Sequence, residues 1–203
     1  MHYFEFSNTE NLFLHYRMNL GAFKEKYMSL VHISGFINGD FLPIATQTQP
    51  VYDPGNFTHQ IGSISNTSLN DVENAINIAH QAFLSWKDSS IAERQNCLKQ
   101  AADLIFQKKD ELKELLISEH GGMLWEAETD FYLGSGVMSM YAQAPDDLLI
   151  PKEISEETGW IRIHKRPKGV ISAIVPWNMP IVLTMMKLGP LLLAGNTVVL
   201  KPS

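Results

Sequence analysis

The sequence predicts an α/β protein built on a parallel sheet, and the observations behind this prediction lie near the carboxyl terminus. Residues 170–175 form an apolar, β-branched run, and residues 197–200 form a second one; both are typical of buried parallel strands. Between them, residues 180–194 are rich in Leu and Met, which favour a helix. Pro180 suits the first turn of this helix and Gly195 its end. Strand, helix and strand in this order predict a βαβ unit.

The amino-terminal third predicts short strands joined by turns. Residues 34–65 contain Asn38-Gly39, a strong hairpin signal, and Asp53-Pro54-Gly55, a second turn. Residues 1–30 mix aromatic and polar side chains without sustained periodicity. We interpret residues 1–33 as an N-terminal extension. Either this extension is native, or translation starts later, near Met28; of the two, we favour the later start.

Four helices are predicted between residues 68 and 144. Ser68 is a candidate N-cap for the first, and Ser90 with Glu93 forms a capping box for the second. We expect a third helix to carry Leu112, Leu115 and Leu116 and to end at Gly121-Gly122, and a fourth to run from about residue 124 to 144. Residues 134–136, Gly-Ser-Gly, predict a close helix contact rather than a phosphate loop, because no strand precedes them.

A β-hairpin is predicted at residues 148–168. Leu148 and Ile150 begin the first strand, residues 156–159 make the turn, and Ile161 and Ile163 lie on one face of the return strand. Trp160, Arg162 and His164 face the other way. An isolated hairpin is only marginally stable in water, so we expect it to meet a partner surface.

Composition excludes several classes of protein. The net charge is −6 and no basic patch occurs, which argues against a nucleic-acid partner. The apolar stretch after Pro180 is interrupted by Lys187 and Gly189-Pro190, so we expect no membrane span. The single cysteine and the lack of a secretory signal predict a cytoplasmic protein. The histidines at 59, 80, 120 and 164 lack paired ligand spacing, so no metal site is predicted and each is interpreted as a surface or packing residue.

Two polar residues follow the predicted parallel strands and make the candidate site. Asn178 comes just after the first strand and Lys201 ends the second, and ligands of such sheets bind beyond the carboxyl ends of the strands. A side-chain amide can donate a hydrogen bond to a developing oxyanion, and a lysine can bind ribose hydroxyls or phosphate. The usual G-x-G-x-x-G phosphate fingerprint is absent from this turn.

The stretches VPWNMP and AGNTVVLKPS, at this spacing, closely resemble the NAD(P)-dependent aldehyde dehydrogenase superfamily. The resemblance extends upstream to about Ser34 and so covers most of the chain: Gly35 to Gly39 is similar to an early strand of the family. The turn Tyr52-Asp53-Pro54-Gly55 is similar to its NPATG turn, with Asp in place of Asn. Residues 119–122, Glu-His-Gly-Gly, are similar to the ETGK end of a helix, with two substitutions.

The resemblance implies an aldehyde dehydrogenase-like fold: an incomplete Rossmann-type cofactor domain with N-terminal helices and a β-hairpin arm. Residues 34–147 would be the N-terminal part of the cofactor-binding domain, 148–168 an oligomerisation arm, and 169–203 the first βαβ unit, truncated. The implied cofactor is NAD or NADP. The implied partners are a small-molecule aldehyde and further copies of the chain, in a homo-oligomer (dimer or tetramer).

The resemblance also assigns roles to residues. Asn178 would be the oxyanion-hole side chain. The cofactor site would include Val175, Pro176, Trp177, Lys201, Pro202 and Ser203. The substrate channel would include Met179, Leu183 and Met186.

Aldehyde dehydrogenases act through a cysteine thiolate, and the resemblance places that cysteine beyond this chain. Cys97 lies in the middle of a predicted helix beside its apolar stripe, so we interpret it as a packing residue. The 203-residue chain alone is therefore expected to be inactive. Three interpretations compete: an aldehyde dehydrogenase sequence that is cut short, one part of a split enzyme, and a non-catalytic fragment that binds a full-length relative. Whether the reading frame continues past Ser203 discriminates among them.

Overall fold

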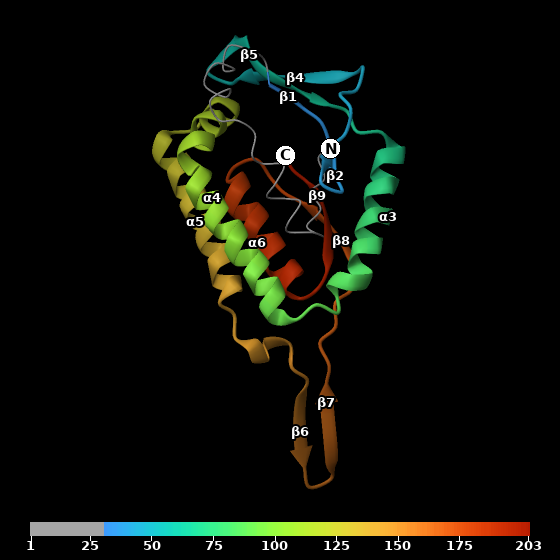
Figure 1. Ribbon diagram of the computed structural model, residues 1–203. Coiled ribbons are helices and arrows are strands. Elements are labelled where there is room, and N and C mark those ends of the chain that lie inside the picture. Colours follow the sequence, from blue (N-terminus) through green and yellow to red (C-terminus); the bar gives the residue numbers. More distant parts are fainter. Residues whose placement is uncertain (1–30) are drawn as a thin grey trace.

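The computed structural model describes residues 31–203 (Figure 1). Its centre is the predicted βαβ unit, formed by β8 (Val170–Ile174), α6 (Pro180–Leu193) and β9 (Thr197–Lys201). The two strands are parallel, and their register pairs Val170 with Thr197 and Ile174 with Lys201. The α/β fold predicted from the sequence is confirmed.

Helices cover both faces of this sheet. Helix α3 (Leu69–Trp86) lies on one face and α6 on the other, and α4 (Ile91–His120) and α5 (Leu124–Ala142) pack outside α6 (Figure 1). The side chains of β9 alternate accordingly: Val198 and Leu200 join the apolar cluster around α6, and Val199 packs with α3. A parallel strand buried on both faces needs this continuous apolar sequence.

Local signals explain where the helices begin and end. Ser68 and Ser90 cap α3 and α4, as predicted, and in the structure both form complete capping boxes. Gly121, with φ 69°, ends α4 in the left-handed conformation. One prediction is wrong: residues 91–120 form a single helix of 30 residues, not two. No Gly or Pro interrupts this stretch, and the pair Lys108–Glu111, at 3.1 Å, supports the continuous helix where a break was expected.

The amino-terminal strands form two small sheets. In the first, β5 (Asn56–Ser65) pairs with β1 (Val31–Ile33) in parallel and with β4 (Thr48–Asp53) in antiparallel. In the second, β2 (Phe36–Ile37) and β3 (Asp40–Phe41) form the predicted hairpin. Its turn residues, Asn38 and Gly39, both have positive φ, as a tight two-residue hairpin turn requires. The predicted extension 1–33 lies mostly outside the described residues.

The predicted hairpin exists and projects from the body of the molecule (Figure 1). It consists of β6 (Lys152–Glu156) and β7 (Gly159–Ile163). The expectation that Leu148 and Ile150 start the first strand is wrong: a 3₁₀ helix, η1 (Asp146–Leu149), precedes the strand. The cause is local, because Pro145 and the two aspartates after it suit the first turn of a helix.

A second correction concerns burial. Both strands of the βαβ unit were predicted to be buried, but only β9 is buried along most of its length. Ile174 at the end of β8 is 61% exposed. The reason is that α3 and α6 both pack more extensively on β9 than on β8. Among residues 31–203, no helix is long and apolar enough to cross a membrane.

Candidate functional site

The candidate site lies at the carboxyl edge of the β8–β9 pair. The register places Ile174 opposite Lys201, so the turn after β8 and the segment after β9 leave the sheet together. The backbone N–H of Val175 donates to the Lys201 carbonyl at 3.1 Å, and Val175 is buried. This bond anchors the first end of the turn that carries Asn178. Sequence reasoning therefore placed Asn178 and Lys201 correctly at one edge of the sheet.

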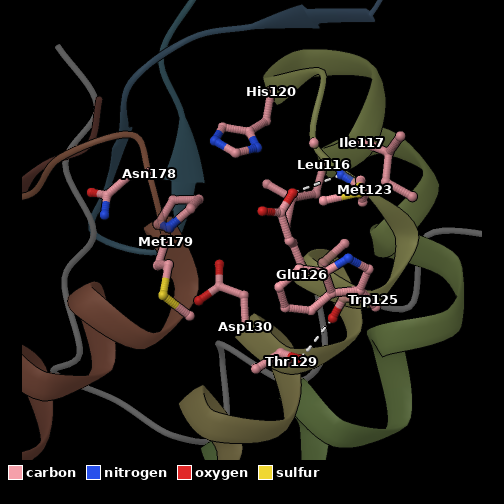
Figure 2. Close-up of a pocket in the computed structure, with 13 residues that line it drawn as sticks. Leu116, Ile117, His120, Met123, Trp125, Glu126, Thr129, Asp130, Asn178 and Met179 are labelled. Carbon is pink, nitrogen blue, oxygen red and sulfur yellow. Dashed lines mark hydrogen bonds between the residues drawn. The ribbon is translucent and has the colours of Figure 1, made fainter.

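Asn178 has an exposed side chain on this turn. Within the part of the chain that the structure describes, no hydrogen bond engages its amide, so the amide can donate to a ligand. Asn178 also lines a cavity of about 130 Å³ between the end of α4, the start of α5 and the start of α6. Figure 2 shows Asn178 and Met179 on one side of this cavity and the side chains of α4 and α5 on the other.

The cavity is mostly apolar with a few polar groups. The apolar part is lined by Leu116, Ile117, Met123, Trp125, Ala127, Met179 and Pro180. The polar part comes from His120, Glu126, Thr129, Asp130 and Asn178. Small-molecule sites commonly combine an apolar wall with a few polar groups in this way.

Asp130 is the most deeply buried of these polar residues, at 2% exposure. Its two carboxylate oxygens accept hydrogen bonds from the backbone N–H groups of Ile181, at 2.9 Å, and Val182, at 2.8 Å. Burial raises the pKa of Asp130, and the two hydrogen bonds and the nearby His120 partly oppose that shift. Sequence reasoning did not single out Asp130, because its partners lie about fifty residues further along the chain.

His120 occupies the opposite side of the cavity. Its Nε2 atom is buried and has no hydrogen-bond partner within the described residues. The ring lies 5.6 Å from the ring of Trp177, centroid to centroid. Glu126 is engaged locally, since its carboxylate accepts from the N–H of Met123 at 2.8 Å and so caps α5. His120 had been interpreted as a surface or packing residue; the structure places it in the cavity wall.

The other residues suggested by the resemblance are scattered along the same edge. Pro176, Trp177 and Ser203 are exposed, and Trp177 is 66% exposed. Lys201 is half-buried, and its Nζ donates to the Pro202 carbonyl at 2.8 Å.

The three suggested channel residues separate in the structure. Met179 lines the cavity. Leu183 is half-buried and Met186 is 54% exposed, and neither lines it. Across residues 31–203 no group of three His, Cys, Asp or Glu side chains could hold a metal ion.

Comparison with known proteins points to one family. The family model described as "Aldehyde dehydrogenase family" matches residues 41–203. The chain is 31% identical over 190 residues to the mitochondrial succinate-semialdehyde dehydrogenase of Rattus norvegicus, and the match covers 92% of this chain and 36% of that protein. The chain thus spans about a third of the length of the curated relatives it matches.

Solved structures agree in fold. An NADP-dependent enzyme of E. coli superimposes with a TM-score of 0.79 at 28% identity, covering 87% of this chain and 37% of that one. The 3,6-anhydro-L-galactose dehydrogenase in complex with NAP superimposes with a TM-score of 0.76 at 29% identity, covering 85% and 36%.

Proposed function

This chain belongs to the aldehyde dehydrogenase family, and we propose that it forms part of an enzyme that oxidises an aldehyde to a carboxylic acid with NAD or NADP. The single observation that carries the proposal is the placement of Asn178: its amide makes no hydrogen bond within the described residues and faces outward at the carboxyl edge of two parallel strands. Ligands of α/β sheets bind at this edge.

Asn178 acts on the oxyanion. When a cysteine thiolate attacks the aldehyde carbon, the carbon–oxygen π electrons move onto oxygen, and the side-chain N–H of Asn178 donates a hydrogen bond to the resulting negative charge. Such a donor stabilises the transition state more than the neutral aldehyde, because charge develops only in the former. The thiolate belongs to a part of the enzyme other than these residues, since Cys97 is the sole cysteine here and lies far along α4.

The residues at the edge suit a nicotinamide dinucleotide. Exposed Ile174, Pro176 and Trp177 offer apolar surface at the end of β8, and Lys201 offers a cation at the end of β9. Lys201 would bind ribose hydroxyls of the cofactor, and Val175, Pro176, Trp177, Pro202 and Ser203 would line its site. A bound oxidised nicotinamide would supply the acceptor for the hydride from the aldehyde carbon after the thiolate has added to it. The proposed cofactor is NAD or NADP.

Met179 favours an apolar substrate. It lies next to Asn178 in the chain and lines the same cavity, and methionine adapts to irregular or aromatic groups. We therefore propose medium-sized apolar or aromatic aldehydes. If Met179→Ala in the complete enzyme leaves the preference among aldehydes of different size unchanged, this part of the proposal is wrong.

The hairpin of β6 and β7 supports a homo-oligomer. All its residues are exposed, and the register places Ile154 opposite Ile161 and Ile163 on the same face. Three isoleucines on one face of an exposed hairpin are poorly compatible with water. We propose that this face contacts a second copy of the chain.

The test of the catalytic proposal is Asn178→Ala in a complete enzyme that contains this chain. Loss of one oxyanion donor is expected to lower kcat about 100- to 1,000-fold while KM changes little. The matched control is Asn70→Ala, at an exposed asparagine on the first turn of α3, which should keep wild-type kinetics. Wild-type kcat in Asn178→Ala would reject the assignment.

A further inference from the structure

We propose that Asp130 is a positioning residue: it anchors the first turn of α6 and thereby holds Asn178 in place for the proposed oxidation. This inference rests on the proposed function of Asn178 and adds a residue to it. The geometry that supports it is the pair of hydrogen bonds from one buried carboxylate on α5 to the first turn of α6. Figure 2 shows the Asp130 side chain directed from α5 toward the start of α6, beside Met179.

The start of α6 depends on this carboxylate. The N-cap residue, Met179, makes no side-chain cap, and Pro180 at the first helical position has no N–H to donate. The next two N–H groups, of Ile181 and Val182, both donate to Asp130. Intrahelical bonding begins only with Leu183, whose N–H donates to the Met179 carbonyl at 3.1 Å. Asp130 therefore satisfies the N–H groups that a helix normally leaves unpaired.

Helix α6 provides the groups that compensate the negative charge of the Asp130 carboxylate. Among the described residues, no ion pair involves Asp130, although it is almost fully buried. The facing titratable groups are His120 from α4 and Glu126 from α5 itself; α6 presents no charged side chain before Lys187. The positive end of the α6 dipole and its two N–H groups thus favour the ionised form. Two hydrogen bonds to one buried carboxylate restrict both rotation and translation of the first turn.

The close approach of α5 to α6 is a second, independent observation. Gly134 lies four residues after Asp130, on the same face of α5. A Cβ built on Gly134 would lie 2.8 Å from Cγ2 of Ile181 and 3.4 Å from the backbone N of Val182. Ile181 and Val182 are also the residues whose N–H groups donate to Asp130. Gly134 therefore allows α5 to approach α6 closely, and Asp130 stabilises this contact by hydrogen bonds.

The connection between Asn178 and the first turn of α6 is short and conformationally restricted. Asn178 lies three residues before Ile181, and Met179 and Pro180 intervene. Proline fixes its own φ and restricts the residue before it. At the other end of the turn, the Val175 N–H is bonded to the Lys201 carbonyl. Asn178 therefore sits on a short turn held at both ends, and Asp130 provides one of the two attachments.

The test is a double-mutant cycle in a complete enzyme that contains this chain. Asp130→Asn keeps the shape of the side chain but replaces one acceptor oxygen with a donor, so one N–H of α6 loses its partner. We expect kcat to fall up to about 100-fold with little change in KM, because a small displacement of a catalytic group has an effect of this size. In the Asn178→Ala background the same substitution should have no further effect on kcat, since Asp130 acts through Asn178.

Asp71→Asn is the matched control. It makes the same carboxylate-to-amide change at the start of a helix, but Asp71 caps α3, where its carboxylate accepts from the N–H of Ser68 at 3.2 Å, and it does not line the cavity. It should leave kcat unchanged when introduced into the wild type or into Asn178→Ala. If Asp130→Asn lowers kcat by the same factor in the wild type and in the Asn178→Ala variant, Asp130 has only a structural role and the inference is wrong.

Hydrogen exchange separates failure of this inference from failure of the proposed function. Amide protons of residues 181 and 182 should exchange slowly in the wild type and faster in Asp130→Asn, with those of α3 unchanged. Unaltered protection in Asp130→Asn overturns the anchor whatever the kinetics. If Asp130→Asn loses this protection but Asn178→Ala keeps the wild-type kcat, Asp130 does anchor α6. The function assigned to Asn178 is then rejected, and so is the positioning role of Asp130.

Discussion

The hydroxyl of Thr197, at the start of β9, donates a 2.8 Å hydrogen bond to the backbone carbonyl of Ala79 in the middle of α3. Thr197 and Ala79 are both buried, and 118 residues of chain separate them. The bond joins β9 to α3, which covers the face of the sheet opposite α6. It shows that α3 is part of the same core as the βαβ unit.

This bond predicts the effect of Thr197→Val. The substitution keeps the branched shape and removes the donor, and the free energy of unfolding should fall by about 1 kcal/mol, a typical net value for one hydrogen bond. Urea denaturation provides the measurement. Thr58→Val is the control, because the Thr58 hydroxyl bonds only to exposed Asn56 and its loss should change stability little. Equal effects of the two substitutions would show that the buried bond contributes nothing.

Two glycines of α5 should respond oppositely to alanine. A Cβ on Gly134 would press on Ile181 at 2.8 Å, whereas a Cβ on Gly136 meets nothing within 4 Å. Gly134→Ala should destabilise the protein by about 1–3 kcal/mol through overpacking. Gly136→Ala should stabilise it by up to about 1 kcal/mol, because alanine favours the helix. Thermal denaturation of both variants checks the signs; a stabilising Gly134→Ala would contradict the close contact of α5 and α6.

The free energy of unfolding should depend on pH in part through Asp130. Its pKa in the folded protein is raised above the ordinary value of 3.8, so between these two pKa values the folded state binds more protons than the unfolded state. The contribution of Asp130 is therefore fully present below pH 3.8 and is lost as pH rises through the raised pKa. In Asp130→Asn this fall with pH should disappear.

Glu93, in the capping box of α4, should change the free energy of unfolding with pH in the opposite direction to Asp130. Hydrogen bonds from Ser90 lower its pKa below the ordinary 4.5, so its stabilising contribution is present above pH 4.5 and is lost as pH falls through the lowered pKa. The free energy of unfolding of the wild type, Asp130→Asn and Glu93→Gln, measured in urea between about pH 3 and pH 7, separates the two effects. Slopes of the same sign at the two sites would contradict the assignment.

The 203-residue chain alone should not oxidise aldehydes. Cys97 lies 19 residues before Leu116, the first residue of α4 that lines the cavity, which is about 29 Å along the helix axis. Formation of NADH or NADPH should therefore be absent with every aldehyde tested. Turnover that disappears in Cys97→Ala would show instead that Cys97 is the nucleophile.

The oligomeric state should depend on the isoleucine face of the hairpin. Ile161→Asp places a charge among Ile154, Ile161 and Ile163, and sedimentation should shift from a dimer or tetramer toward smaller species. Ser155→Asp, on the opposite face of the same hairpin, should keep the wild-type state. A wild-type monomer, or an unchanged state in Ile161→Asp, would reject the hairpin as the contact between copies.

The sequence alone determined the features that depend on neighbours in the chain. Capping boxes at Ser68 and Ser90, the Asn38-Gly39 hairpin turn, and the βαβ unit follow from hydrogen bonds and periodicity within a few residues. The same holds for Asn178 and Lys201, whose common edge follows from the topology of parallel strands. The long α4 was also encoded locally, but its moderate apolar periodicity was misinterpreted as two helices.

Only the tertiary structure decided the rest. The bond from α6 to Asp130 joins residues about fifty positions apart, and nothing within α5 marks that aspartate as a helix cap for another element. The exposure of β8 depends on where α3 and α6 rest on the sheet. A buried carboxylate, a close helix contact and the exposure of a strand are set by neighbours that folding brings together, so local sequence patterns do not specify them.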